Sequence, residues 1–121
     1  MKNILSINKA AAGAIPRGSI VKYDSTDDTV VVSTADTDAQ LGVMDQATAA
    51  ASGDRVDIMI MGIANTLAGG TITRGAFVQT DSAGAAITSD GTSRIIGMAL
   101  VSAVVGDLFP VLLTPGKEVV A

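Results

Sequence analysis

Hydrophobic and polar residues alternate along much of this chain, in short runs separated by small polar residues. Within residues 55–61, Val56 and Ile58 would face one side of an extended segment, while Asp57 and Met59 would face the other. A period of two is typical of a β-strand. One end of this strand is apolar on both faces, which predicts either a central place in the fold or contact with another subunit.

The rest of the chain also follows a β pattern. Short runs of β-branched residues are bounded by Gly, Asp, Ser and Thr, which favour turns. The predicted strands are residues 19–23, 29–33, 40–44, 55–61, 76–80, 94–101 and 107–113, with a short return strand at 85–87. The single helical candidate is residues 46–51. The sequence therefore predicts an all-β protein.

Two stretches of the chain resemble one another in the same order. Ile-Pro-Arg-Gly-Ser-Ile-Val-Lys-Tyr-Asp returns later as Ile-Thr-Arg-Gly-Ala-Phe-Val-Gln-Thr-Asp. The matching segments are 15–24 with 72–81, 41–44 with 96–99, and 52–60 with 105–113. We therefore predict a β-sandwich or small barrel built from two sequence-related halves, at residues 15–60 and 72–113.

Length and composition predict one domain with a thin core. The chain has 121 residues, and its 48% hydrophobic content is rich in alanine and valine, with only three aromatic residues. Chains with thin cores often gain further burial by assembling with copies or partners. We expect residues 1–14 to form an extended N-terminal arm and residues 15–121 to form a single β domain.

The same composition excludes several classes of function. The chain has no cysteine and no histidine, so a disulfide, a thiol nucleophile and a histidine base or ligand are excluded. A net charge of −4 with scattered basic residues argues against nucleic-acid binding, and no apolar run is long enough to span a membrane. Asp27-Asp28 and the pair Asp36/Asp38 lack the ligand spacing of a calcium loop. We predict no catalytic residue, cofactor or metal.

Some residues at equivalent positions of the two halves are candidates for turns or contacts. Asp54 and Asp107 each follow a glycine and are expected to accept hydrogen bonds from backbone amides of the turn. Arg17 and Arg74 are either turn residues or contacts to a negatively charged partner. The methionines either fill gaps in the core or lie at a subunit interface. The interface candidates are Met59, Met61 and Met98.

A family resemblance rests on glycine-rich segments in a particular order. They are Ala-Ala-Gly-Ala-Ile-Pro-Arg-Gly (11–18), Leu-Gly-Val (41–43), Ser-Gly-Asp-Arg-Val (52–56), Met-Gly-Ile-Ala (61–64), Ile-Thr-Arg-Gly (72–75), Ile-Gly-Met-Ala-Leu (96–100) and Val-Gly-Asp (105–107). With these segments the chain resembles the small capsid cement, or head decoration, proteins of tailed bacteriophages. The resemblance extends over about residues 4–113.

The resemblance implies a non-enzymatic protein that binds the outer surface of a mature phage capsid. It would be made in the host cytoplasm, join the virion on the capsid exterior, and cement adjacent capsomers of the major capsid protein. It also implies a homo-oligomer, with a trimer favoured, and an N-terminal segment that reaches the capsid. The residues implied in capsid binding are Asn3, Ile4, Leu5, Ile7, Arg17 and Arg74.

Three alternatives remain at this point. In the first, residues 3–7 form a first strand that pairs within its own chain. In the second, the protein is another phage structural component, such as a tail or head–tail adaptor part, because those share this composition. A small-ligand-binding β module is the third alternative, although the three aromatic residues, Tyr23, Phe77 and Phe109, are few for a ligand platform.

Overall fold

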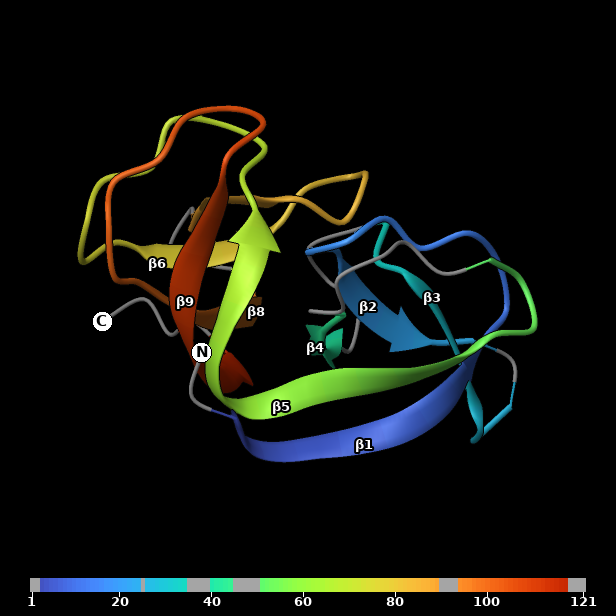
Figure 1. The fold of residues 1–121 in the computed structure, drawn as a ribbon. Coiled ribbons are helices and arrows are strands. Elements are labelled where there is room, and N and C mark those ends of the chain that lie inside the picture. The colour runs from blue at the N-terminus through green and yellow to red at the C-terminus, as the bar shows by residue number, and fades with distance from the viewer. Residues whose placement is uncertain (1–2, 25, 35–39, 45–50, 90–93, 118–121) are drawn as a thin grey trace.

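All secondary structure in the described part of the chain is β. The computed structural model describes residues 3–24, 26–34, 40–44, 51–89 and 94–117, and Figure 1 shows its two lobes side by side. The strands are β1 (Asn3–Ala11), β2 (Ile20–Tyr23), β3 (Thr29–Val32), β4 (Gln40–Val43), β5 (Arg55–Leu67), β6 (Phe77–Thr80), β7 (Ala86–Thr88), β8 (Arg94–Ala99) and β9 (Leu108–Lys117). The all-β prediction is confirmed. The helix predicted at residues 46–51 lies outside the described residues, except for its last position.

The first five strands close into a mixed β-barrel, which we call lobe 1. The strand order is β1-β3-β2-β4-β5, and β5 pairs back with β1. All of these pairings are antiparallel except that of β1 with β3. Of the two architectures predicted, sandwich or small barrel, this part of the chain therefore adopts the barrel.

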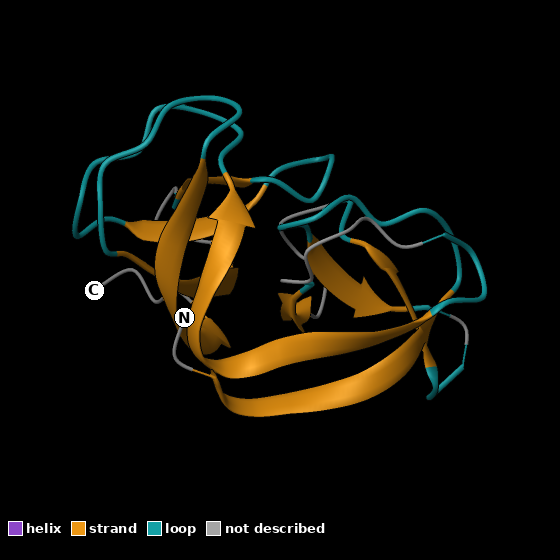
Figure 2. Ribbon diagram, viewed as in Figure 1, coloured by secondary structure: helices purple, strands orange, loops and turns teal. Residues whose placement is uncertain are grey.

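Strand β1 belongs to the barrel and does not project from it. Its backbone pairs with β5 from Asn3, opposite Gly62, to Ala10, opposite Arg55. Residues 3–11 therefore follow the alternative in which the first strand pairs within its own chain. Figure 2 shows β1 and β5 running together along the length of lobe 1.

Strand β5 is longer than predicted and serves both lobes. The sequence predicts a strand that ends at residue 61, whereas β5 continues to Leu67. Gly62 has a φ of 114°, a backbone conformation that glycine adopts more easily than other residues. At this residue the strand paired with β5 changes from β1 to β9. The predicted end of the strand is therefore a bend within one continuous strand.

The second half of β5 and the four outer strands form a second lobe, which we call lobe 2. The sheet continues from β5 in the order β9-β8-β6-β7, with all pairings antiparallel. A parallel bridge between Ala68 and Ala86 brings the end of this sheet back to the residue that follows β5. The strands of lobe 2 are thus paired in the same order as the strands of lobe 1.

Several local features occur in both lobes. The pairing of Ala10 with Arg55 has a counterpart in the pairing of Leu67 with Leu108. Gly53 and Gly106, which open the two Gly-Asp turns, have φ values of 91° and 92°. The two lobes are therefore built from matching turns and matching registers.

Each lobe has a hydrophobic core, and β5 contributes to both. Ile58 lies in the cluster of lobe 1, and its neighbour Met59 lies in the cluster of lobe 2. The lobe 1 cluster comprises Ala11, Ile15, Val21, Val30, Met44, Val56 and Ile58. The two apolar faces of the predicted strand are thus both buried within one chain, because one face packs in the lobe 1 core and the other in the lobe 2 core.

Candidate functional site

The described residues show no candidate metal site. No three His, Cys, Asp or Glu residues among them come close enough to hold a metal ion. None of the described segments is a helix that could cross a membrane. The carboxylates of Asp54 and Asp107 accept hydrogen bonds from the amides of Ala51, at 2.9 Å, and Val104, at 3.1 Å. Their predicted role in the turns is confirmed.

One end of lobe 1 carries a polar network. Nη1 of Arg55 lies 2.6 Å from Oδ2 of Asp28, and its Nε donates to Oδ1 of Asn8 at 2.7 Å. Asn8 in turn donates to Asp57 at 3.1 Å. The hydrogen bond from Arg55 holds the pKa of the Asp28 carboxyl below its usual value. These exposed groups link β1, β5 and the turn before β3, where the barrel closes.

Lys9 and Tyr23 extend this network on the same end of lobe 1. Nζ of Lys9 donates to the backbone carbonyl of Asp27 at 2.7 Å and lies 5.1 Å from the centre of the Tyr23 ring. An ammonium group at this distance from an aromatic face is attracted by the ring. The acidic turn between β2 and β3 is therefore held by contacts to both Lys9 and Arg55.

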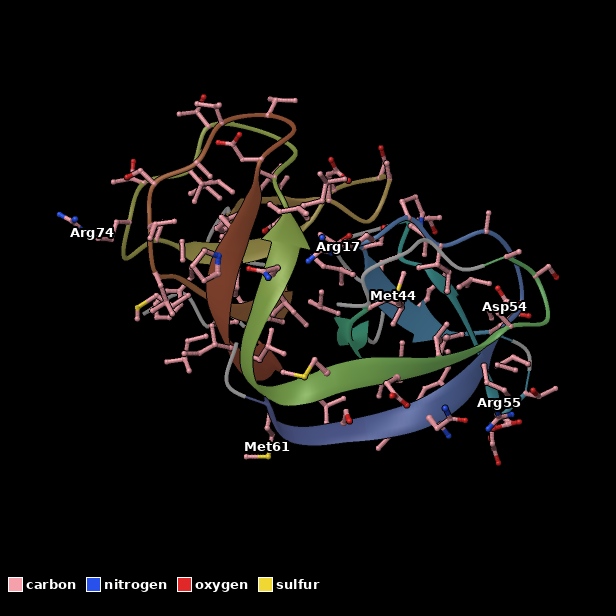
Figure 3. The ribbon with its side chains drawn as sticks, in the orientation of Figure 1. Arg17, Met44, Asp54, Arg55, Met61 and Arg74 are labelled. Atoms are coloured by element: carbon pink, nitrogen blue, oxygen red, sulfur yellow. The ribbon has the colours of Figure 1, made fainter. Side chains whose placement is uncertain are left out.

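The residues predicted for capsid binding do not form one site. Asn3, Leu5 and Ile7 pair through their backbones with β5, and Ile7 packs against the lobe 1 core. Arg17 is half-buried and lies between the lobes, whereas Arg74 is exposed at the end of lobe 2 away from lobe 1 (Figure 3). Equivalent sequence positions thus have different surroundings.

The three methionines predicted at a subunit interface also separate. Met59 is only 6% exposed because it packs within the chain, so it has little surface to offer a subunit. Met61 is 48% exposed, and Met98 is half-buried opposite Phe77 in the pairing of β6 with β8. An interface that includes Met61 or Met98 remains a prediction.

An exposed apolar loop in lobe 2 was missed by the sequence reasoning. Val101, Val104 and Val105 are 41%, 56% and 70% exposed, on the connection between β8 and β9. The sequence carries a signal for this loop, since Val104-Val105 directly precedes the Gly-Asp turn, where polar residues are usual. Ala51-Ser52 occupies the same position before the turn of lobe 1. The loop is therefore a candidate contact surface in lobe 2, and lobe 1 has no valine pair before its own Gly-Asp turn.

The described residues thus form an all-β fold of two lobes that share β5. The chain belongs to the phage cement protein family, whose model matches residues 2–112. Members of this family are non-enzymatic structural proteins of the virion, at the surface of the phage head. The resemblance seen in the sequence is thereby confirmed.

A solved structure has the same fold over nearly the whole chain. It is described as "The crystal structure of head fiber gp8.5 N base in bacteriophage phi29", with a TM-score of 0.72 and 21% identity. The match covers 93% of this chain and 96% of that chain. A search among curated proteins found no match.

Proposed function

We propose that this protein binds the outer surface of a mature phage head and cements adjacent capsomers of the major capsid protein. The observation that carries the proposal is membership of the cement protein family over residues 2–112. A protein that binds the mature shell more tightly than its precursor stabilises the mature shell by the difference in affinity. Many copies on a repeating lattice also gain from multivalency.

The exposed valine loop is our candidate for the contact with the capsid. This loop exposes the aliphatic side chains of Val101, Val104 and Val105. Covering such side chains with a partner removes apolar surface from water, which favours binding. Among the residues predicted from the resemblance, Asn3, Ile4 and Leu5 remain further candidates. Arg17 is less suited to this role, because it lies between the two lobes (Figure 3).

We also propose that the chain is a duplicated five-stranded unit that folds as one cooperative domain. Matching registers, matching Gly-Asp turns and the resemblance of residues 15–60 to 72–113 support the duplication. The sharing of β5 supports cooperativity, since neither lobe keeps all its strands if this strand is removed. A homo-oligomer remains our expectation, with a trimer favoured.

The proposed function is tested by co-sedimentation with expanded phage heads that lack the decoration protein. We expect saturation at a constant number of copies per capsomer. The double variant Val104→Asp/Val105→Asp should remain folded and lose binding. Ser82→Asp, in the exposed turn between β6 and β7, is the matched control and should bind normally.

Two outcomes would contradict this proposal in different ways. No binding by the folded wild-type protein would argue against the capsid role and favour another phage component, such as a tail part. Normal binding by the double valine variant would retain the capsid role but remove the valine loop from the contact.

A further inference from the structure

Lobe 1 covers part of lobe 2 with three apolar side chains. Ile20, Val43 and Met59 are neighbours in the sheet, because Ile20 pairs with Val43 and Val43 pairs with Met59. All three are buried, and they belong to the hydrophobic cluster of lobe 2. The lobes are therefore joined by side-chain packing as well as by β5.

The backbones of the two lobes also meet at this contact. The amide of Leu67 donates to the carbonyl of Gly18 at 2.9 Å, and the amide of Ile20 donates to the carbonyl of Gly84 at 2.7 Å. A Cβ atom on Gly18 would lie 2.6 Å from Cδ2 of Leu108, so this position has no room for a side chain. The contact is closely packed on both sides.

Lobe 2 carries the same arrangement of three apolar residues, but uncovered. Phe77 pairs with Met98, and Met98 pairs with Leu112, which repeats the pairing of Ile20, Val43 and Met59. We call Phe77, Met98 and Leu112 the lobe 2 patch. Phe77 is 46% exposed, and the other two residues are half-buried.

The glycine beside the lobe 2 patch is also uncovered. Gly75 occupies the place that Gly18 has in lobe 1. The Gly75 amide donates to the carbonyl of Ala99, the last residue of β8, at 2.8 Å, and the Gly18 amide donates to the carbonyl of Met44, directly after β4, at 2.9 Å. A Cβ atom on Gly75 would meet nothing within 4 Å. The backbone next to the lobe 2 patch is therefore open to a partner.

Lobe 1 also carries a surface equivalent to the part of lobe 2 that it covers. Ile20, Val43 and Met59 of lobe 1 share one hydrophobic cluster with lobe 2 residues that include Ala64, Ile96 and Leu113, all of them buried. The corresponding positions in lobe 1 are Ile7, Leu41 and Ile60, which we call the lobe 1 patch. These residues are only partly buried, and they pack against the edge of the lobe 1 core.

Acidic and basic side chains lie at equivalent positions of this contact. The turn at Gly84 touches lobe 1, and the same sequence position in lobe 1 carries Asp24, Asp27 and Asp28, of which Asp28 is paired with Arg55. Arg74 is exposed next to Gly75, at the end of the molecule away from this acidic turn (Figure 3). In a head-to-tail contact between copies, Arg74 of one copy would approach the acidic turn of the next.

We propose that the lobe 2 patch of one copy packs on the lobe 1 patch of a second copy, in the geometry that joins the lobes within one chain. The partner is a copy of this protein because the internal contact already shows two surfaces of this kind fitting together. The arrangement is heterologous, so copies add head to tail and form a ring where the rotation closes.

Complementary variants test this proposal without any capsid. We expect the wild-type protein to be an oligomer by light scattering, and Phe77→Asp and Leu41→Asp each to be monomers of 12.1 kDa. Each variant keeps one intact patch, so an equimolar mixture should form a dimer that cannot grow. Val105→Asp, with its substitution outside both patches, should keep the wild-type mass.

Three results would overturn the proposal. They are a monomeric wild-type protein, a folded Phe77→Asp variant with the wild-type mass, and a mixture of folded variants that stays monomeric. Should Leu41→Asp fail to fold, Phe77→Cys and Ile60→Cys single variants replace it, since the chain has no cysteine. When mixed and oxidised they should form a mixed disulfide dimer, and its absence would also count against the proposal. Because no capsid is present, this failure is separate from failure of the proposed function.

Discussion

Replacing Ile58 tests the assignment of the inner face of β5. The side chain is fully buried in the lobe 1 core. Truncation of a buried isoleucine to alanine costs about 2–5 kcal/mol, because apolar contacts are lost and a cavity remains. An aspartate adds about 1–3 kcal/mol, since a carboxyl group is buried without a hydrogen-bond partner. The total of about 3–8 kcal/mol is comparable with the whole stability of a typical domain, about 5–15 kcal/mol.

Thermal unfolding followed by far-ultraviolet circular dichroism measures this loss. One kcal/mol shifts the Tm of a domain of this size by about 4 °C, so Ile58→Ala should melt about 8–20 °C below wild type. Ile58→Asp should be largely unfolded or aggregated at room temperature. Met61→Asp is the control on the same strand, because Met61 is exposed, and its stability should change by less than about 0.5 kcal/mol. An Ile58→Asp variant that melts like Met61→Asp would refute the strand facing.

Three other measurements examine β1, the close approach of β8 to β9, and the polar network. Deletion of residues 1–9 removes most of β1, so cooperative thermal unfolding should be lost; an unchanged melting curve would show that the barrel closes without it. Gly97→Ala would place a Cβ atom against the backbone of β9 and should destabilise by about 1–3 kcal/mol in urea unfolding, whereas Gly13→Ala, with open space around it, should be neutral. The lowered pKa of Asp28, caused by Arg55, contributes stability above the ordinary carboxyl pKa, and this contribution is lost as the pH falls through the lowered value. The stability difference between wild type and Asp28→Asn should therefore shrink in acid, and a difference that is constant or grows would contradict this linkage.

Strand positions could be predicted well because the period of two and the turn residues are local signals. Five of the seven main predicted strands match observed strands to within two residues at both ends. The other two, at residues 55–61 and 107–113, start within one residue of β5 and β9, but these strands continue to Leu67 and Lys117. The longer β5 was missed because Gly62 reads as a turn when only its neighbours in sequence are considered. Its place between β1 and β9 is a tertiary property, and the paired strands on both sides keep the chain extended there.

The surroundings of equivalent residues could not be predicted from the repeat. Arg17 and Arg74 occupy matching sequence positions, yet one lies between the lobes and the other at a free end (Figure 3). The same holds for Ile20, which is buried, and Phe77, which is exposed. A resemblance between two segments predicts their local structure, but the packing of one lobe on the other decides which surfaces remain uncovered.

The role of β1 was open for a related reason. A short alternating segment at the start of a chain can pair with its own sheet or with a partner, and both give the same pattern of residues. The pairing with β5 distinguishes these alternatives, and it depends on residues about fifty positions away.

The shared strand has a consequence for the order of folding during synthesis. β1 leaves the ribosome first, but its partner residues at 55–62 are made much later, so lobe 1 cannot close until most of the first half of the chain has emerged. Once lobe 1 has closed, it holds the beginning of β5 extended. The remaining half of that strand then offers an ordered edge on which β9 can pair, which lowers the entropic cost of forming lobe 2. We therefore expect lobe 1 to act as the template on which the C-terminal half of the protein folds.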